Sequence, residues 1–231
     1  MFTKLRFILR RLFSKQSVKM LCIGMEESKY AGSCPGTGRG AIRFFNKVKP
    51  RCNYAKLLLS SQATMFAVRN ELQNVCESNL AIIFYSGHGG QKKGSQNETD
   101  GKDEFLGLYD GPMMDNEIWS IVSQAKGRVF MIFDCCHSET MFRGIPDLLP
   151  RRNEPLDLLC WASCGEGEVG YSIPTRGGLF TTVILKNIKA GNTYDQAWKQ
   201  IIKNKMLAKY ETSRATILKA HSDFDDTKIF S

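Results

Sequence analysis

The chain has 231 residues, of which 42% are hydrophobic and 24% charged, values that are ordinary for a globular protein and argue against intrinsic disorder. No apolar run approaches the roughly 18 residues of a membrane-spanning helix. The net charge is +9, but residues 1–19 hold six of the basic residues and no acid. The remaining 212 residues carry 26 basic and 23 acidic side chains, a net charge of only +3. Composition therefore does not indicate a nucleic-acid-binding domain.

Residues 1–17 form a basic leader whose apolar residues recur with helical spacing. On a helix these apolar residues share one side, opposite most of the lysines and arginines: Phe2, Leu5, Ile8, Leu9, Leu12 and Phe13. Such a helix can lie on an anionic membrane surface or dock on a partner. The simpler alternative is an appendage packed on its own domain, or a frayed terminus. A secretory signal is disfavoured because arginines interrupt its apolar core.

Eight cysteines invite a disulfide framework, but the chain is long and shows no clear secretory signal. Cys22, Cys76 and Cys160 lie in or beside apolar runs, where a free cysteine behaves as a small hydrophobic residue. We therefore expect a reducing compartment and a cytoplasmic location.

From residue 18 onward, apolar strand patterns alternate with helical ones. In chain order they predict a strand at 18–23, a Gly-rich loop at 32–40, a helix at 41–48, a strand at 55–59, a helix at 64–75 that Thr64 can cap, and a strand at 80–85. Next come a polar loop at 91–102, a strand at 105–109, a helix at 115–124, a strand at 129–133 and a proline-punctuated loop at 140–155. The last elements are a strand at 156–162, helices at 179–188 and 194–210, and a strand at 215–220.

Strands that are apolar throughout and separated by helices indicate a mostly parallel sheet covered on both faces. We expect an α/β fold of three layers with about six strands in its central sheet. In such folds ligands bind at the carboxyl ends of the strands. The two most unusual motifs of the chain follow strands there, SGHGG at 86–90 and DCCHS at 134–138.

The two motifs supply what attack by a thiol on a carbonyl needs. A thiol must be deprotonated, and a histidine within reach serves as the base and later protonates the leaving amine. His88 stands among glycines that can expose N–H donors to a developing oxyanion, and Cys136 follows the other strand. The alternatives are a structural loop histidine and a buried cysteine pair. Cys135, Cys136, His137 and Cys164 are residues of the types that bind zinc. A zinc site is disfavoured, because adjacent cysteines lack the usual spacing of zinc ligands.

These residues carry a resemblance to a known family. YSGHGG at 85–90 followed by DCCHS at 134–138 resembles the His and Cys motifs of the caspase-like cysteine peptidases, closest to metacaspases and their prokaryotic relatives. The Q-A-C-x-G ending of true caspases is missing. Further similarity lies at GKDEFLGLYD (101–110), DLLCWASCGEGE (157–168), GGLFT (177–181) and DDTKIF (225–230), so that it covers about residues 18–231.

The resemblance implies a role for each matching residue. Cys136 is the nucleophile, His88 is the general base and acid, and the N–H groups of Gly89 and Cys136 form the oxyanion hole. Asp134 lines the S1 pocket and selects Arg or Lys at P1, in agreement with the bidentate pairing of carboxylate and guanidinium. The expected substrates are polypeptides with a basic P1 residue.

The chain departs from the family in its early acidic segment. Metacaspases usually carry a second S1 aspartate there, whereas GSCPGTGRGA at 32–41 holds no acid and has Arg39 instead. Glu166 or Glu168 is our candidate for completing the pocket. No cofactor is required by this chemistry. Many metacaspases need calcium, for which acids near the His loop are available, although an acidic loop is more often only solvated: Asp100, Asp103, Glu104, Asp110 and Asp115.

The predicted organisation is a leader (1–17) and a peptidase domain (18–231), the latter divided into a large-subunit-like part (18–145), a linker (146–155) and a small-subunit-like part (156–231). The linker contains Arg151 and Arg152, which are candidates for self-cleavage. Metacaspases resemble monomers, so a monomer is expected here. The leading function is a cysteine endopeptidase that cleaves after Arg or Lys. The alternatives are a non-proteolytic caspase-like scaffold and a basic module that binds a membrane or nucleic acid through its leader.

Overall fold

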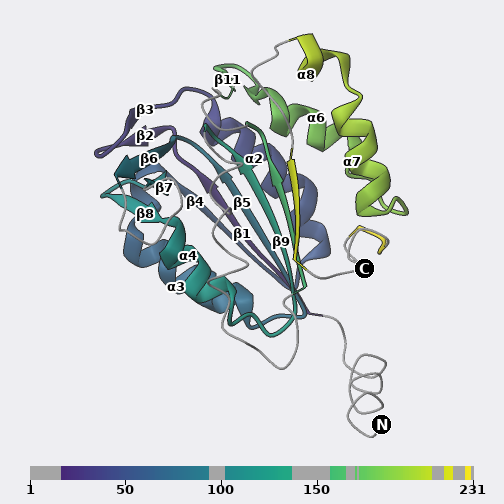
Figure 1. Ribbon diagram of the computed structural model, residues 1–231, viewed down its shortest axis with the longest axis horizontal. Coiled ribbons are helices and arrows are strands. Elements are labelled where there is room, and N and C mark those ends of the chain that lie inside the picture. The colour runs from purple at the N-terminus through teal and green to yellow at the C-terminus, as the bar shows by residue number, and fades with distance from the viewer. Residues whose placement is uncertain are drawn as a thin grey trace, which may run out of the picture.

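The computed structural model describes residues 17–93, 102–136, 157–164, 170, 172–209, 216–220 and 227–229 (Figure 1). Its centre is a six-stranded sheet with the order β13-β10-β9-β5-β1-β4. The strands are β1 (Val18–Gly24), β4 (Tyr54–Leu59), β5 (Leu80–Ser86), β9 (Arg128–Asp134), β10 (Leu158–Ala162) and β13 (Thr216–Ala220). All neighbours pair in parallel except β10 and β13. This confirms the predicted α/β class and the mostly parallel sheet.

Helices cover both faces of the sheet, as Figure 1 shows. One face packs against α2 (Thr37–Val48), α6 (Leu179–Asn187), α7 (Tyr194–Ile202) and α8 (Lys205–Lys209). The other packs against α3 (Met65–Cys76) and α4 (Asp115–Val122). Because side chains alternate along a strand, β5 is buried on both sides, with Phe84 stacked on Phe44 of α2 and Tyr85 facing the α3 side. Its unbroken apolar run is the consequence.

Three small sheets complete the described part of the chain. The strands are β2 (Glu27–Ser28) with β3 (Gly32–Ser33), β6 (Gly89–Lys93) with β7 (Lys102–Gly107) and β8 (Pro112–Met114), and β11 (Ser172–Ile173) with β12 (Gly177–Gly178). Two short 3-10 turns are η1 (Lys49–Arg51) and η2 (Ser60–Gln62). In Figure 1 the labels β2, β3, β6, β7 and β8 gather at the upper left, beyond the carboxyl ends of the parallel strands. They therefore border the edge where the two motifs lie.

Several predicted boundaries are wrong, each for a physical reason. Strand β6 extends to Lys93 into the expected polar loop, because its backbone pairs with β7 rather than following an apolar pattern. Helix α2 begins at Thr37, inside the expected Gly-rich loop. The helix predicted at 194–210 is two helices, since the Asn204 side chain accepts a hydrogen bond from Met206 N (2.9 Å) and caps α8. The expected cap at Thr64 is confirmed by its bond from Ala67 N.

Only part of the predicted domain organisation falls on residues that the structure describes. Residues 1–16 of the leader and the linker at 146–155 lie outside them. The large-subunit-like part contributes β9 and the small-subunit-like part contributes β10, and these two strands pair in parallel. Both parts thus build one sheet. Among the helices that the structure describes, none is long and apolar enough to cross a membrane.

Candidate active site

Strand register brings His88 and Cys136 to the same edge of the sheet. β5 and β9 are neighbours, with Ser86 opposite Asp134 as the last pair. His88 follows Ser86 by two residues and Cys136 follows Asp134 by two, so both residues leave the sheet at equivalent positions. Gly89 fits closely against this junction, because a Cβ added there would overlap the Cys136 carbonyl oxygen. The glycines of the His motif therefore allow its backbone to approach the Cys motif.

The His88 ring is oriented by the backbone of β3. His88 is half-buried, and its Nε2 lies 3.0 Å from the Ser33 carbonyl oxygen. A carbonyl oxygen only accepts, so Nε2 carries the hydrogen and Nδ1 of the neutral ring is left as the acceptor. The main chain is held as well, since the Tyr85 hydroxyl (2.7 Å) and Gly107 N (2.9 Å) both donate to the His88 carbonyl. The ring and its loop are thereby fixed from two sides.

The two adjacent cysteines have different surroundings. Cys136 is half-buried, and its Sγ accepts a hydrogen bond from Gly170 N at 3.4 Å. Cys135 is buried, and burial raises the pKa of its thiol well above the usual value. Both backbone groups of Cys135 bond the Ser163 hydroxyl, at 3.1 and 3.0 Å. Only Cys136 is accessible to a substrate.

The structure records no hydrogen bond between the His88 ring and the Cys136 sulfur, both of which belong to its described part. Catalytic hydrogen bonds are often long before substrate binds and tighten in the reacting complex. The two residues therefore share an edge of the sheet without yet being paired.

Asp134 is buried at the carboxyl end of β9 and connects this strand to α6. Its carboxylate accepts hydrogen bonds from the backbone N (3.2 Å) and the hydroxyl of Thr181, the third residue of α6. The carboxylate thus caps the N-terminus of the helix, where a negative charge is favourable. Burial raises the pKa of Asp134 to about 6, although the bonds from Thr181 act in the opposite direction. Gly178 makes room for this contact, since a Cβ there would overlap the carboxylate.

Sequence reasoning missed several residues that border the site. Ser33, Gly170 and Thr181 contact the predicted site residues. Ser33 and Thr181 lie in segments quoted above, GSCPGTGRGA and GGLFT, but no role was predicted for either, and Gly170 lies in no such segment. Cys34 and Glu26 are two more. Burial, followed by the nearby charges of Cys136, Asp134 and Glu26, raises the pKa of Cys34 to about 11. No sequence signal indicates that Glu26 belongs to the site, because its proximity to Cys34 depends on how the chain folds back after β1.

The acids proposed for calcium do not converge in the described part of the chain. Glu104 is buried and accepts from the Gln91 side chain (3.0 Å), Asp110 accepts from Met65 N (2.8 Å), and Asp115 accepts from Asn116 N (2.7 Å). No group of three or more His, Cys, Asp or Glu side chains that could hold a metal occurs among the described residues. Activation by calcium stays a prediction, because Asp100 lies outside the described residues.

Several residues predicted from the sequence lie outside the described residues: Asp100, His137, Arg151, Arg152, Glu166 and Glu168.

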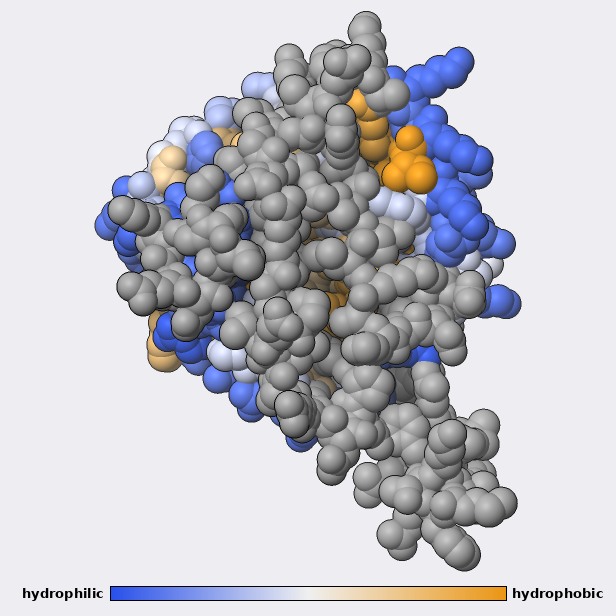
Figure 2. Space-filling view, viewed as in Figure 1, coloured by the Kyte–Doolittle hydropathy of each residue, from blue (hydrophilic) through white to orange (hydrophobic). Residues whose placement is uncertain are grey.

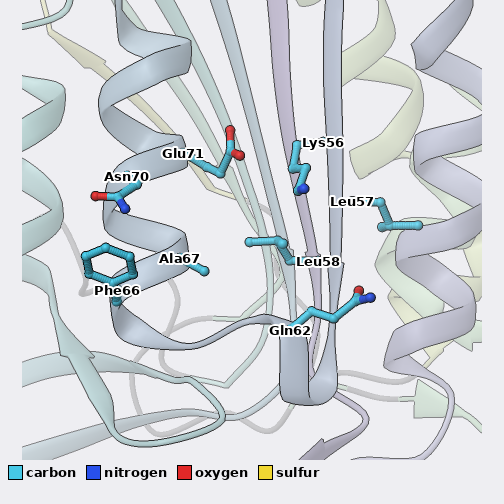
Figure 3. A pocket seen from close by; sticks show the side chains of 8 residues that line it. All are labelled: Lys56, Leu57, Leu58, Gln62, Phe66, Ala67, Asn70 and Glu71. Carbon is cyan, nitrogen blue, oxygen red and sulfur yellow. The ribbon is translucent and has the colours of Figure 1, made fainter.

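Elsewhere on the described surface, a groove lies between β4 and α3. Figure 3 shows its lining: Lys56, Leu57, Leu58, Gln62, Phe66, Ala67, Asn70 and Glu71. None of these is a predicted site residue. An orange, apolar patch is visible at the upper right of Figure 2, where Figure 1 places α7 and α8, the helices of the exposed Ile202 and Met206. Neither feature adjoins the His and Cys motifs.

The geometry above agrees with a comparison against protein families. A sequence model of the caspase domain matches residues 43–216. The chain belongs to the caspase-domain family. It thus carries a caspase-type peptidase domain, which includes both motifs of the site. The matched part begins within α2, so β1 precedes it in the chain.

Solved structures support the fold of this caspase domain. The crystal structure of a protein from Geobacter sulfurreducens matches with a TM-score of 0.75 and 20% sequence identity, covering 93% of this chain and 98% of that one. At this identity the likeness concerns the fold alone. Among curated proteins, none matches the chain significantly.

Proposed function

We propose that the protein is a cysteine endopeptidase in which Cys136 and His88 form a catalytic dyad. The observation that supports it best is the register of β5 and β9, which places a histidine and an accessible thiol at equivalent strand ends of a caspase domain. The substrates are polypeptides.

In the proposed mechanism, Nδ1 of His88 removes the thiol proton and the Cys136 sulfur attacks the scissile carbonyl carbon. The Ser33 carbonyl holds Nε2–H and stabilises the imidazolium that forms. Gly89 and Cys136 N–H groups bind the oxyanion. His88 then gives its proton to the leaving amine, and the acyl group stays on sulfur. Water, activated by the same ring, attacks the thioester and releases the second product.

The proposed specificity is for Arg or Lys at P1, with Asp134 supplying negative charge to the S1 pocket. The carboxylate is buried and bonded only to neutral groups of Thr181 among the bonds described, so its charge is not neutralised there. A guanidinium or ammonium group would be attracted to it. Self-cleavage after Arg151 or Arg152 is part of the same proposal.

The alternative is a caspase-like scaffold that binds a peptide without hydrolysing it. The segment 32–41 favours the scaffold, since this segment lacks the acid that metacaspases usually carry there. Retention of both His88 and Cys136 favours the enzyme.

The test is an assay of the purified protein on peptides that end in Arg, Lys or Asp at P1, beside the variant Cys136→Ala. Each reaction is run with calcium and with a chelator, which also tests activation by calcium. Hydrolysis after Arg or Lys that the variant lacks supports the proposal. Binding of these peptides without turnover by the wild-type protein would support the scaffold instead.

A further inference from the structure

The segment from β3 into α2 forms one border of the candidate site. The Ser33 carbonyl contacts the His88 ring, and two residues later the Pro35 carbonyl accepts a hydrogen bond from the Ser172 hydroxyl (2.9 Å). Ser172 follows Gly170, whose N–H donates to the Cys136 sulfur, by two residues. Cys34 thus lies between the side of the site that holds the base and the side that holds the nucleophile.

The pKa of the Cys34 thiol shows which charged groups lie near this border. The negative charges that raise the pKa of its thiol, beyond the effect of burial, belong to Cys136, Asp134 and Glu26. The carboxylates of Glu26 and Asp134 therefore act on one region beside the nucleophile, although Asp134 ends β9 and Glu26 follows β1.

Glu26 is held so that its carboxylate lies along the start of α2. Its Oε1 accepts a hydrogen bond from Gly36 N (3.3 Å), and its main-chain carbonyl accepts one from Cys34 N (2.8 Å). A Cβ added at Gly38 would be 2.6 Å from Oε2. The carboxylate thus occupies space that a side chain at position 38 would need. Segment 32–41 has no acid of its own, yet Glu26, which follows the last residue of β1 by two positions, lies against it.

Neither carboxylate has a cationic partner in the described part of the chain. The ion pairs found there are Arg69–Glu117, Lys126–Glu77, Arg128–Asp157 and Lys199–Asp195. A partly or fully buried carboxylate without a cationic partner is unfavourable, and a cation that binds beside it relieves this cost.

Beside the unpaired carboxylates, a buried hydroxyl group near Asp134 also lacks a hydrogen-bond partner in the described part of the chain. Ser86 is fully buried, and its Oγ has no hydrogen-bond partner among the described residues. It is paired in register with Asp134 and, by strand alternation, lies on the same face of the sheet. An unpaired buried hydroxyl is costly, so a polar group arriving beside Asp134 would gain from it.

We infer that Glu26 is the second acid of the S1 pocket and, together with Asp134, binds the guanidinium or ammonium group of the P1 residue. This rests on the proposed function. It assigns to Glu26 the part for which the sequence suggested Glu166 or Glu168. Glu26 is a binding residue and takes no part in bond cleavage.

The test compares two peptides that differ only in P1, one with Arg and one with citrulline, its uncharged isostere. In Glu26→Gln the side-chain oxygen can still accept from Gly36 N, while the charge is lost. We expect the preference in kcat/KM for Arg over citrulline to fall by about tenfold or more, with citrulline hydrolysis nearly unchanged. The matched control is Glu27→Gln, which removes the same charge from the exposed neighbouring residue and should keep the wild-type preference.

A binding measurement separates this inference from the proposed function. Agmatine, the side chain of Arg as a free cation, is titrated calorimetrically into Cys136→Ala and into Cys136→Ala with Glu26→Gln. The second protein should bind it about tenfold more weakly or not at all. Glu26 is not an S1 residue if Glu26→Gln keeps the Arg preference, if Glu27→Gln lowers it equally, or if both proteins bind agmatine alike. Failure of the wild-type protein to hydrolyse any peptide overturns the peptidase, and the titration then decides Glu26 by itself.

Discussion

At the scale of single residues, Cys135 and Cys136 show how one step along the chain changes the chemistry of a thiol. Successive residues at a strand end point to opposite faces, so only one of them can meet His88. Cys135 is buried with a raised pKa, whereas Cys136 is accessible and has an N–H donor at its sulfur. Reactive cysteines are thiolates in partly exposed, polar surroundings, and buried thiols are inert.

Replacing each thiol separately tests this assignment. Cys136→Ala should lower kcat by about 10³-fold or more, since nucleophile and base act as a unit. Cys135→Ala should keep most of the activity, because that side chain faces the core. The measurement is kcat on one Arg peptide for both variants, with circular dichroism to confirm folding. An inactive but folded Cys135→Ala beside an active Cys136→Ala would move the nucleophile to residue 135.

Asp134 gives the proposed specificity a pH dependence. Burial raises its pKa to about 6, so the carboxylate is charged above that pH and becomes neutral as the pH falls below it. The preference in kcat/KM for Arg over citrulline should therefore fall as the pH is lowered through about 6. The dyad acts on both substrates, so its contribution cancels in the ratio. Asp134→Asn should have a low preference at every pH. A wild-type ratio that stays constant between about pH 5 and 8 would show that Asp134 does not recognise the cation.

At the scale of elements, the site depends on close approach between backbones. The Asp134 carboxylate reaches the first turn of α6 because Gly178, the residue directly before this helix, has no side chain. This contact attaches α6, which follows β10 in the chain, to β9, the strand after which Cys136 lies. A side chain at 178 would separate them.

Gly178→Ala should therefore lower stability by about 1–3 kcal/mol, the usual cost of overpacking, and reduce activity with it. Gly40→Ala is the matched control. It faces the same turn from α2, but its added Cβ would meet Gly177, Gly178 and Thr181 at 3.7 Å, an ordinary contact. In a helix this exchange is favourable by up to about 1 kcal/mol. Urea unfolding of both variants provides the comparison, and equal midpoints would show that α6 moves aside at no cost.

Which elements the sequence predicts depends on where their stability comes from. The sequence predicts β5 and β9 because both faces of each strand are buried, which requires a continuous apolar run. Strand β6, with the sequence GGQKK, has no such pattern and exists through its pairing with β7. The same holds for the site. His88 and Cys136 stand in motifs, whereas Ser33, Gly170 and Glu26 reach it through contacts distant in sequence, which no local pattern records.

At the scale of the whole molecule, the linker at 146–155 joins two parts that already share a sheet. β9 precedes it and β10 follows it, and five residue pairs connect them in parallel register, from Leu158↔Val129 to Ala162↔Phe133. The Asp134–Thr181 contact adds a second connection across the same boundary. Burial of both strands stabilises this junction independently of chain continuity. A cut in the linker should therefore leave both parts associated.

Self-cleavage in this linker is the expected consequence of a peptidase that selects basic P1 residues. The sequence DLLPRRNEP at 147–155 offers Arg151 and Arg152, and proline-rich polar segments are preferred sites of proteolysis. Cleavage after Arg152 is favoured because Asn153 is an acceptable P1′ residue. Incubated wild-type protein should yield fragments of 152 and 79 residues on denaturing analysis by intact mass, while native size-exclusion chromatography still shows one species. Cys136→Ala should remain whole. The same two fragments from that variant would point to a contaminating protease, and an active wild-type protein that stays intact would mean that these arginines are only solvated.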